Sequence, residues 1–110
     1  MPFDAQLADR IRGLVSRRKG FSEKKMFGGV GFLLNGNMCI GIWKEFLILR
    51  LGPAKYESAL KEPFVKEFDI TGKTMSGWVM VEPGGVETDT SLNSWVELAI
   101  RFVRALPAKD

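Results

Sequence analysis

Apolar residues recur every three or four positions at both ends of the chain and every second position in its middle. The first spacing lines one face of a helix, and the second lines one face of a strand. We therefore expect an amphipathic helix over residues 4–18, capped by Asp4 and ended by Gly20. A longer helix follows Asp89 or Thr90, either of which can cap it. Its apolar stripe consists of Leu92, Trp95, Val96, Ala99, Phe102, Val103 and Leu106.

Asn35-Gly36 is the strongest turn signal in the chain. Both residues tolerate the positive φ of a type I′ turn, so a strand over residues 23–34 is expected to enter a hairpin there. A weaker signal at Lys44-Glu45 predicts a second reversal. The predicted pairs of the first turn are Leu34–Asn37, Leu33–Met38, Phe32–Cys39 and Gly31–Ile40. Those of the second turn are Ile42–Leu47, Ile40–Leu49, Cys39–Arg50 and Met38–Leu51.

These registers sort the side chains of the three strands onto two faces. The predicted core face carries Leu33, Met38, Ile40, Ile42, Leu47, Leu49 and Leu51. The opposite face carries Val30, Phe32, Leu34, Cys39, Trp43, Phe46, Ile48 and Arg50. Because the second face is also too apolar to be left to water, either helices cover both faces or a partner covers one. The candidate interaction surface taken from this face is Phe32, Cys39, Trp43, Ile48 and Arg50.

The remaining pattern completes one α+β domain over residues 1–110. Pro53 begins a short helix over residues 53–61, which Pro63 stops. Two further strands are expected over residues 65–70 and 77–82. The predicted order is α-β-β-β-α-β-β-α, which favours a two-layer fold with a five-stranded antiparallel sheet over a doubly wound parallel one.

Composition places the chain among ordinary globular proteins. It has 110 residues, of which 45% are hydrophobic and 26% charged. No apolar run approaches the roughly 20 residues that a membrane helix needs, so we expect no membrane contact. A single cysteine excludes an intramolecular disulfide and makes a reducing cytoplasm the simplest location.

The absence of histidine removes the commonest general base, metal ligand and activator of nucleophiles. We therefore expect no catalytic residue, metal site or cofactor, and no enzyme. Cys39 lacks a histidine partner and lies among apolar residues, which favours a buried, unreactive thiol. Arg50 either forms an ion pair, for instance with Glu82, Asp69 or Glu97, or points at a partner, and the ion pair is favoured.

Two glycine motifs imitate phosphate-binding loops. Gly28-Gly29-Val30-Gly31 begins a dinucleotide pattern, but Leu34 replaces its last glycine and a hairpin follows instead of a helix. Glycines within a strand more often permit a bulge or a close backbone approach. Thr71-Gly72-Lys73-Thr74 resembles the end of a Walker A loop, but Glu67 stands where the upstream glycine is required. We interpret both motifs as structural.

The basic charge is concentrated at the start of the chain. Residues 1–25 hold seven basic and three acidic side chains, whereas residues 26–110 hold nine and ten. Direct nucleic-acid binding by the first helix is therefore an alternative function. The favoured role of these basic residues is to form a solvated helix surface, because they do not share one face and no helix-turn-helix signature is present. The candidate contacts are Arg10, Arg17, Arg18, Lys24 and Lys25, with Arg12 and Lys19 beside them.

The run from Lys24 to Gly29, together with Phe32 and the Asn35-Gly36-Asn37-Met38 turn, resembles the N-terminal domain of the TfoX/Sxy competence regulators. The similarity continues through Leu49-Arg50, Tyr56, Phe68 and Gly77-Trp78. It implies a bacterial, cytoplasmic protein with a two-layer fold similar to secretion chaperones, in a family that regulates genes for DNA uptake. The namesake proteins carry a second, C-terminal domain; this chain ends at Asp110, so we expect a stand-alone N-terminal domain.

The leading hypothesis is a non-catalytic protein-interaction module, related to competence regulators, that forms a homodimer and binds a protein partner that the sequence does not identify. The alternative is nucleic-acid binding by the basic helix. A third hypothesis, a small-ligand site, would use Trp43, Trp78 and Arg50.

Overall fold

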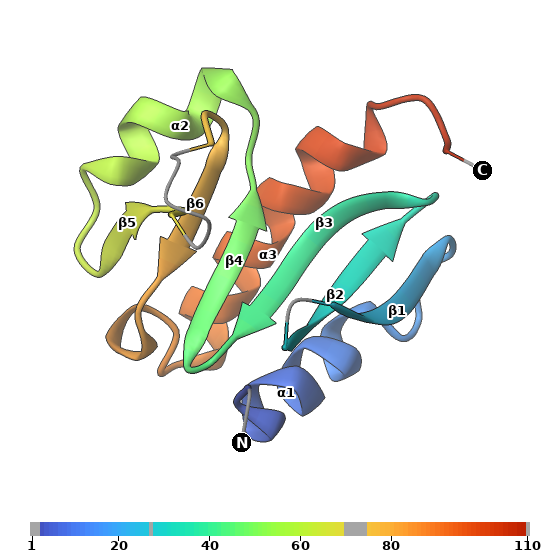
Figure 1. Ribbon diagram of the computed structural model, residues 1–110, viewed down its shortest axis with the longest axis horizontal. Helices are drawn as coiled ribbons and strands as arrows, with labels where there is room; N and C mark the ends of the chain where they lie inside the picture. Colours follow the sequence, from blue (N-terminus) through green and yellow to red (C-terminus); the bar gives the residue numbers. More distant parts are fainter. Residues whose placement is uncertain (1–2, 27, 70–74, 110) are drawn as a thin grey trace.

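The computed structural model describes residues 3–26, 28–69 and 75–109, and Figure 1 shows their arrangement. Within these residues, helices pack on one face of a six-stranded antiparallel sheet. The elements are α1 (Ala5–Val15), β1 (Phe21–Met26), β2 (Gly29–Leu34), β3 (Asn37–Trp43), β4 (Phe46–Arg50), α2 (Pro53–Leu60), β5 (Val65–Glu67), β6 (Trp78–Val81), the 3-10 turn η1 (Pro83–Gly85) and α3 (Asp89–Arg104).

The sheet has one strand more than the sequence predicts. The stretch expected as a single strand over residues 23–34 is two antiparallel strands, β1 and β2, in which Phe21 pairs with Leu34 and Met26 with Gly29. Gly28 lies at the reversal with φ +77°, a conformation that glycine adopts without strain. The strand order across the sheet is β1-β2-β3-β4-β6-β5. The α+β class and the antiparallel sheet are confirmed, the count of five strands is wrong, and the likeness to secretion chaperones stays a prediction.

The hairpin of β2 and β3 contains a β-bulge at Cys39. Asn35 and Gly36 adopt φ of +52° and +83°, and the pairs next to the turn, Leu34–Asn37 and Leu33–Met38, form as predicted. The register then shifts, so that Phe32 pairs with Ile40 instead of Cys39, and Gly31 pairs with Gly41 instead of Ile40. The extra residue reverses the phase of β2 relative to the rest of β3.

The bulge exchanges residues between the two predicted faces. Val30, Phe32, Leu34 and Cys39 are buried in the main core, where the sequence analysis did not place them. Conversely, Leu33 and Met38 leave the predicted core and are partly exposed. The second turn is closer to expectation: the Ile42–Leu47 and Ile40–Leu49 pairs form. The ladder of β3 and β4 ends at Ile40–Leu49, so the predicted Cys39–Arg50 and Met38–Leu51 pairs are wrong.

The core lies between the sheet and the three helices. In Figure 1, α3 passes behind β3 and β4, and α1 lies below β2. The buried helical side chains are Leu7, Ala8, Ile11 and Val15 of α1, Tyr56 and Ala59 of α2, and Leu92, Val96, Ala99, Ile100 and Val103 of α3. They form one cluster with the helix-facing strand residues, which include Phe32, Ile40, Ile42, Leu47, Leu49, Val79 and Val81.

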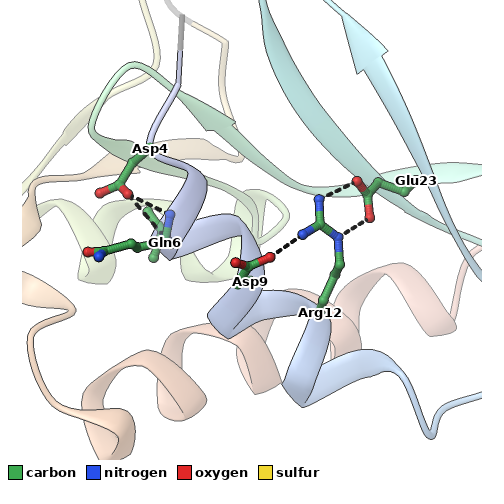
Figure 2. Close-up of polar contacts among 6 residues, drawn as sticks. Asp4, Gln6, Asp9, Arg12 and Glu23 are labelled. Atoms are coloured by element: carbon green, nitrogen blue, oxygen red, sulfur yellow. Dashed lines mark hydrogen bonds and ion pairs between the residues drawn. The ribbon is translucent and has the colours of Figure 1, made fainter. Parts of the chain in front are cut away.

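One polar contact caps the start of α1 and another ties the helix to the edge strand β1, and Figure 2 shows both. The Asp4 carboxylate caps the helix by accepting from the backbone N–H groups of Gln6 at 3.0 Å and Leu7 at 3.1 Å, as predicted. At the other end, the Arg12 guanidinium donates twice to the Glu23 carboxylate of β1, each at 2.7 Å, and also to Asp9. This bidentate pair lowers the pKa of Glu23.

The three helices lie where the sequence predicts them, but their ends differ. α1 ends at Val15, three residues before the expected end at residue 18, and its C-cap is Ser16 rather than Gly20. The predicted helix over residues 53–61 is α2, with Pro53 in its first turn. The cap of α3 is Thr88 rather than Asp89 or Thr90, since the Thr88 hydroxyl accepts from the Ser91 N–H at 3.0 Å. The strand expected over 65–70 comprises Val65–Glu67, and Ile70 lies outside the described residues. In the described part of the chain, no helix has the length and apolar character needed to cross a bilayer.

Candidate interaction surface

The side of the sheet that faces away from the helices is the candidate surface, and we call it the open face. Cross-strand pairs define it, because directly opposed residues point to the same side. Ile48 of β4 pairs with Met80 of β6, and Trp43 pairs with Phe46. Arg50 pairs with Trp78 at the far end of β4. The apolar residues at open-face strand positions are Leu33, Met38, Trp43, Phe46, Ile48, Trp78 and Met80.

The centre of the open face is shielded by its own neighbours. Ile48 and Met80 are each only 5% exposed, whereas Trp43 and Phe46 beside them are partly exposed. Gly41, opposite Ile48, leaves room for the Met38 methyl group, which would lie 2.9 Å from a Cβ at that position. The surface is therefore a packed apolar layer whose outer edges reach solvent.

A hollow opens at the end of the open face formed by Trp43. It measures about 400 Å³ and is lined by Trp43, Phe46, Lys66, Glu67, Asp69 and Met80. The rings of Trp43 and Phe46 stack with centroids 6.3 Å apart, and the Lys66 ammonium lies 4.3 Å above the Phe46 ring. A hollow with aromatic walls beside a lysine suits an apolar anchor side chain that has a polar neighbour.

Arg50 occupies the opposite end of the open face. Its guanidinium lies 5.4 Å from the ring of Trp78 and 5.9 Å from the ring of Phe102 on α3. It donates one long hydrogen bond, of 3.5 Å, to the Met38 carbonyl. The predicted ion pair is wrong, since among the described residues no carboxylate lies within 4.0 Å of this guanidinium. Arg50 is instead held by aromatic rings.

The five residues chosen from the sequence separate into two groups. Trp43, Ile48 and Arg50 lie on the open face. Phe32 and Cys39 do not, because they are 2% and 0% exposed and belong to the core on the helix side. Their assignment to an exposed face was wrong, and its cause is the bulge at Cys39, which a regular hairpin register does not contain.

Met80 and Lys66 also border this surface, although the sequence alone did not indicate them. Both come from strands whose partners are distant in sequence: β6 pairs with β4, and β5 pairs with β6. The alternation in Trp78-Val79-Met80-Val81 shows that Trp78 and Met80 share a face, but sequence alone does not tell which strand they adjoin.

The third hypothesis, a small-ligand site, is not supported by these positions. Trp78 and Arg50 are neighbours, but Trp43 pairs with Phe46, four residues before Arg50 along β4. Four residues of strand span about 13 Å, so these side chains do not line one small pocket.

The basic residues near the start of the chain are partly neutralised. Arg10 pairs with Asp89 at 3.3 Å, Arg12 pairs with Glu23 and Asp9, and Arg18 pairs with Glu97. Arg17, Lys19, Lys24 and Lys25 are exposed. The sites of Lys24 and Lys25 lie on β1 and alternate between its two sides. The arrangement therefore does not present one continuous basic surface, which counts against the nucleic-acid alternative.

The glycine motif over residues 28–31 lies in a turn and a strand, with no helix after it. Its interpretation as a structural feature is confirmed, because a phosphate-binding loop of that class must open a helix. The other motif, Thr71–Thr74, lies outside the described residues.

Cys39 is expected to be inert in the folded protein. Burial raises the pKa of its thiol to about 12 from an ordinary 9.0, although the Arg50 charge acts in the opposite direction. Since the thiolate is the nucleophile, a disulfide reagent at pH 8 should modify the native protein slowly and the unfolded protein rapidly, with one thiol per chain. Fast modification of native protein would contradict the buried position.

The same shift predicts a loss of stability in base. The folded-state pKa of Cys39 is the higher one, so its contribution is complete below about pH 9 and is lost as the pH rises toward 12. Three pKa units correspond to at most about 4 kcal/mol. Burial and the Glu67 carboxylate also raise the pKa of Tyr56, which acts in the same direction. Urea titrations at pH 8 to 11 should therefore show a smaller pH dependence for Cys39→Ala than for the wild type, and equal slopes would contradict the shift.

Comparison with known proteins identifies the family of this chain. No curated protein matches the chain. The family model described as the TfoX N-terminal domain matches residues 13–103, which include β1 to β6 and all but the last residue of α3. A match over nearly the whole chain shows the family, so this protein belongs to the TfoX N-terminal domain family.

Proposed function

We propose that this protein is a non-catalytic regulatory module that acts by binding a protein partner through the open face of its sheet. The observation that carries the proposal is the composition of this face. It holds Trp43, Phe46 and Trp78 with partly exposed rings, and within the described residues all three helices lie on the other side. Aromatic and methionine side chains are enriched where protein surfaces associate.

The family supports a regulatory role. The TfoX N-terminal domain family is regulatory and competence-related, and it is not a known enzyme family. The chain also contains no histidine, and its cysteine is buried with a raised pKa. These properties favour binding over covalent catalysis. With one thiol and no predicted disulfide, a cytoplasmic location also belongs to the proposal.

The open face has two candidate occupants within this function. One is a second copy of the chain, as in the homodimer expected from the sequence, and the other is a different protein. Light scattering at micromolar concentration separates them, because a monomer at that concentration leaves the face available for a different protein.

A photocrosslinking amino acid tests the position of the interface. Placed at Phe46 on the open face, it should yield an adduct in the native host, and placed at exposed Ala54 on α2 it should not. The partner protein in the adduct is then identified and purified. Its affinity should fall at least tenfold for Phe46→Glu, since a charge would enter an apolar contact, and should be unchanged for Ala54→Glu.

The proposal fails if Phe46→Glu binds the identified protein with the same affinity as the wild type. It also fails if the crosslinker at position 46 gives no adduct, either with a different protein or with a second copy of the chain. Urea unfolding of both variants provides the folding control. Because Phe46 is partly exposed, we expect Phe46→Glu to fold.

A further inference from the structure

We infer that the occupant of the open face is an acidic, apolar segment of a different protein, and that one of its carboxylates binds Arg50. This inference rests on the proposed function and adds the chemistry of the partner. It is carried by the charges on the face and by the surroundings of Arg50.

The strands separate their charges by face. Glu23 of β1 points to the helix side, where it meets Arg12, and Glu67 of β5 points to the same side, where it accepts from the Tyr56 hydroxyl at 3.1 Å. The charged residues at open-face strand positions are all basic: Lys24, Arg50 and Lys66. The apolar layer is therefore bordered by basic side chains on β1, β4 and β5. At β5, Glu67 and Asp69 line the hollow together with Lys66, so this end suits the apolar part of a partner and the Arg50 end suits its carboxylate.

Arg50 has donors to spare for an anion. A guanidinium carries five N–H donors in a fixed plane, and with the described residues this one makes a single hydrogen bond, of 3.5 Å. The rings of Trp78 and Phe102 orient the group without satisfying its N–H donors. An arginine placed beside aromatic rings with free N–H donors is suited to a bidentate contact with a planar carboxylate.

The same charges disfavour a second copy on this face. A twofold dimer buries the same patch of both chains, so the basic set Lys24, Arg50 and Lys66 of one copy would enter the same interface as that of the other. Like charges brought together in an interface cost affinity, whereas carboxylates from a different protein would be attracted.

A protein segment also fits better than a nucleic acid. Single-stranded nucleic acids bind by stacking bases on exposed aromatic faces along a basic groove. Here the Lys44 ammonium lies 4.5 Å from the centre of the Trp43 ring and the Lys66 ammonium lies 4.3 Å from that of Phe46, so a lysine of this chain already occupies one face of each ring.

Selection from a random twelve-residue peptide library displayed on phage tests the inference with the full chain as bait. We expect the selected peptides to combine apolar residues with at least one Asp or Glu. Calorimetry then compares one selected peptide with its Asn or Gln analogue. The analogue and the Arg50→Lys variant should each weaken binding about tenfold or more, with little further loss when combined, because both remove one contact. The control Arg104→Gln, at an exposed position in the last turn of α3, should bind like the wild type.

The remaining outcomes contradict the inference in distinguishable ways. Peptides without carboxylates whose binding is lost in Phe46→Glu would overturn it and leave the proposed function standing. No enrichment, or binding that neither variant changes, would overturn both. A micromolar homodimer that Phe46→Glu dissociates would assign the face to a second copy. Binding of a twenty-nucleotide single-stranded DNA that Arg50→Lys weakens would assign it to nucleic acid.

Discussion

Replacing Phe32 by alanine is expected to lower the free energy of unfolding by about 3–5 kcal/mol. Its side chain is 2% exposed and is among the largest that are fully buried, so truncation leaves a cavity between β2 and the helices. Domains of this size are stable by about 5–15 kcal/mol, so the loss is a large fraction of the total. Urea unfolding followed by tryptophan fluorescence measures it.

Leu33→Ala is the matched control, because Leu33 is the next residue along the same strand and points to the open face. It is only partly buried, so we expect a loss of about 1 kcal/mol. A regular hairpin predicts the opposite order, with Leu33 in the core and Phe32 on the exposed face. A larger loss for Leu33→Ala than for Phe32→Ala would therefore contradict the bulge at Cys39.

The turns and helices of this fold could be predicted from the sequence because their signals are local. Asn35-Gly36 adopts the positive φ angles that this dipeptide favours, and Asp4 caps α1. The pairs on both sides of the turn follow directly, because a two-residue loop fixes the register next to it. The predicted register holds through the Leu33–Met38 pair and fails at the next residue, Cys39.

The position of the bulge could not be predicted, because the strand glycines nearby permit a bulge without fixing which residue is inserted. Bulge glycines are a common signal, but here the extra residue is a small apolar cysteine, which fits a core position as well as an exposed strand position. One inserted residue then inverted the phase of β2 and removed Phe32 and Cys39 from the expected surface. Trp43, Ile48 and Arg50 kept their predicted face because β4 pairs with β3 beyond the bulge.

The partners of the open face from β5 and β6 needed a long-range pairing that sequence does not encode locally. β4 is joined to α2, yet its neighbour in the sheet is β6, more than 25 residues further along the chain. The hollow beside Phe46 therefore emerges only in the folded protein, where Lys66 and Met80 arrive next to it. The extra strand β1 was missed for a related reason. A glycine such as Gly28 occurs both in a turn between two strands and inside one long strand, and the sequence does not distinguish these cases.

Replacing Gly29 by alanine is expected to lower the free energy of unfolding by about 3 kcal/mol. Gly29 begins β2, and a Cβ there would lie 2.1 Å from the carbonyl oxygen of Ile42 on β3. That oxygen belongs to the backbone of the neighbouring strand, so it cannot rotate away as the end of a side chain could. Accommodating the methyl group requires β2 and β3 to separate near the open-face end that carries Trp43. Urea unfolding measures the loss, and the peptide affinity of the open face should fall with it.

Two other glycines show whether this cost comes from the close approach or from glycine chemistry in general. Gly13 is exposed within α1, and a Cβ there meets no atom within 4 Å, so Gly13→Ala should raise stability by about 0.5–1 kcal/mol. Gly28 also has free space, but its φ of +77° should make Gly28→Ala cost about 1–2 kcal/mol. The three variants thus separate helix propensity, backbone strain and collision between strands. If Gly29→Ala costs no more than Gly28→Ala, the contact with Ile42 does not explain the glycine, and the strands are not held as closely as this structure has them.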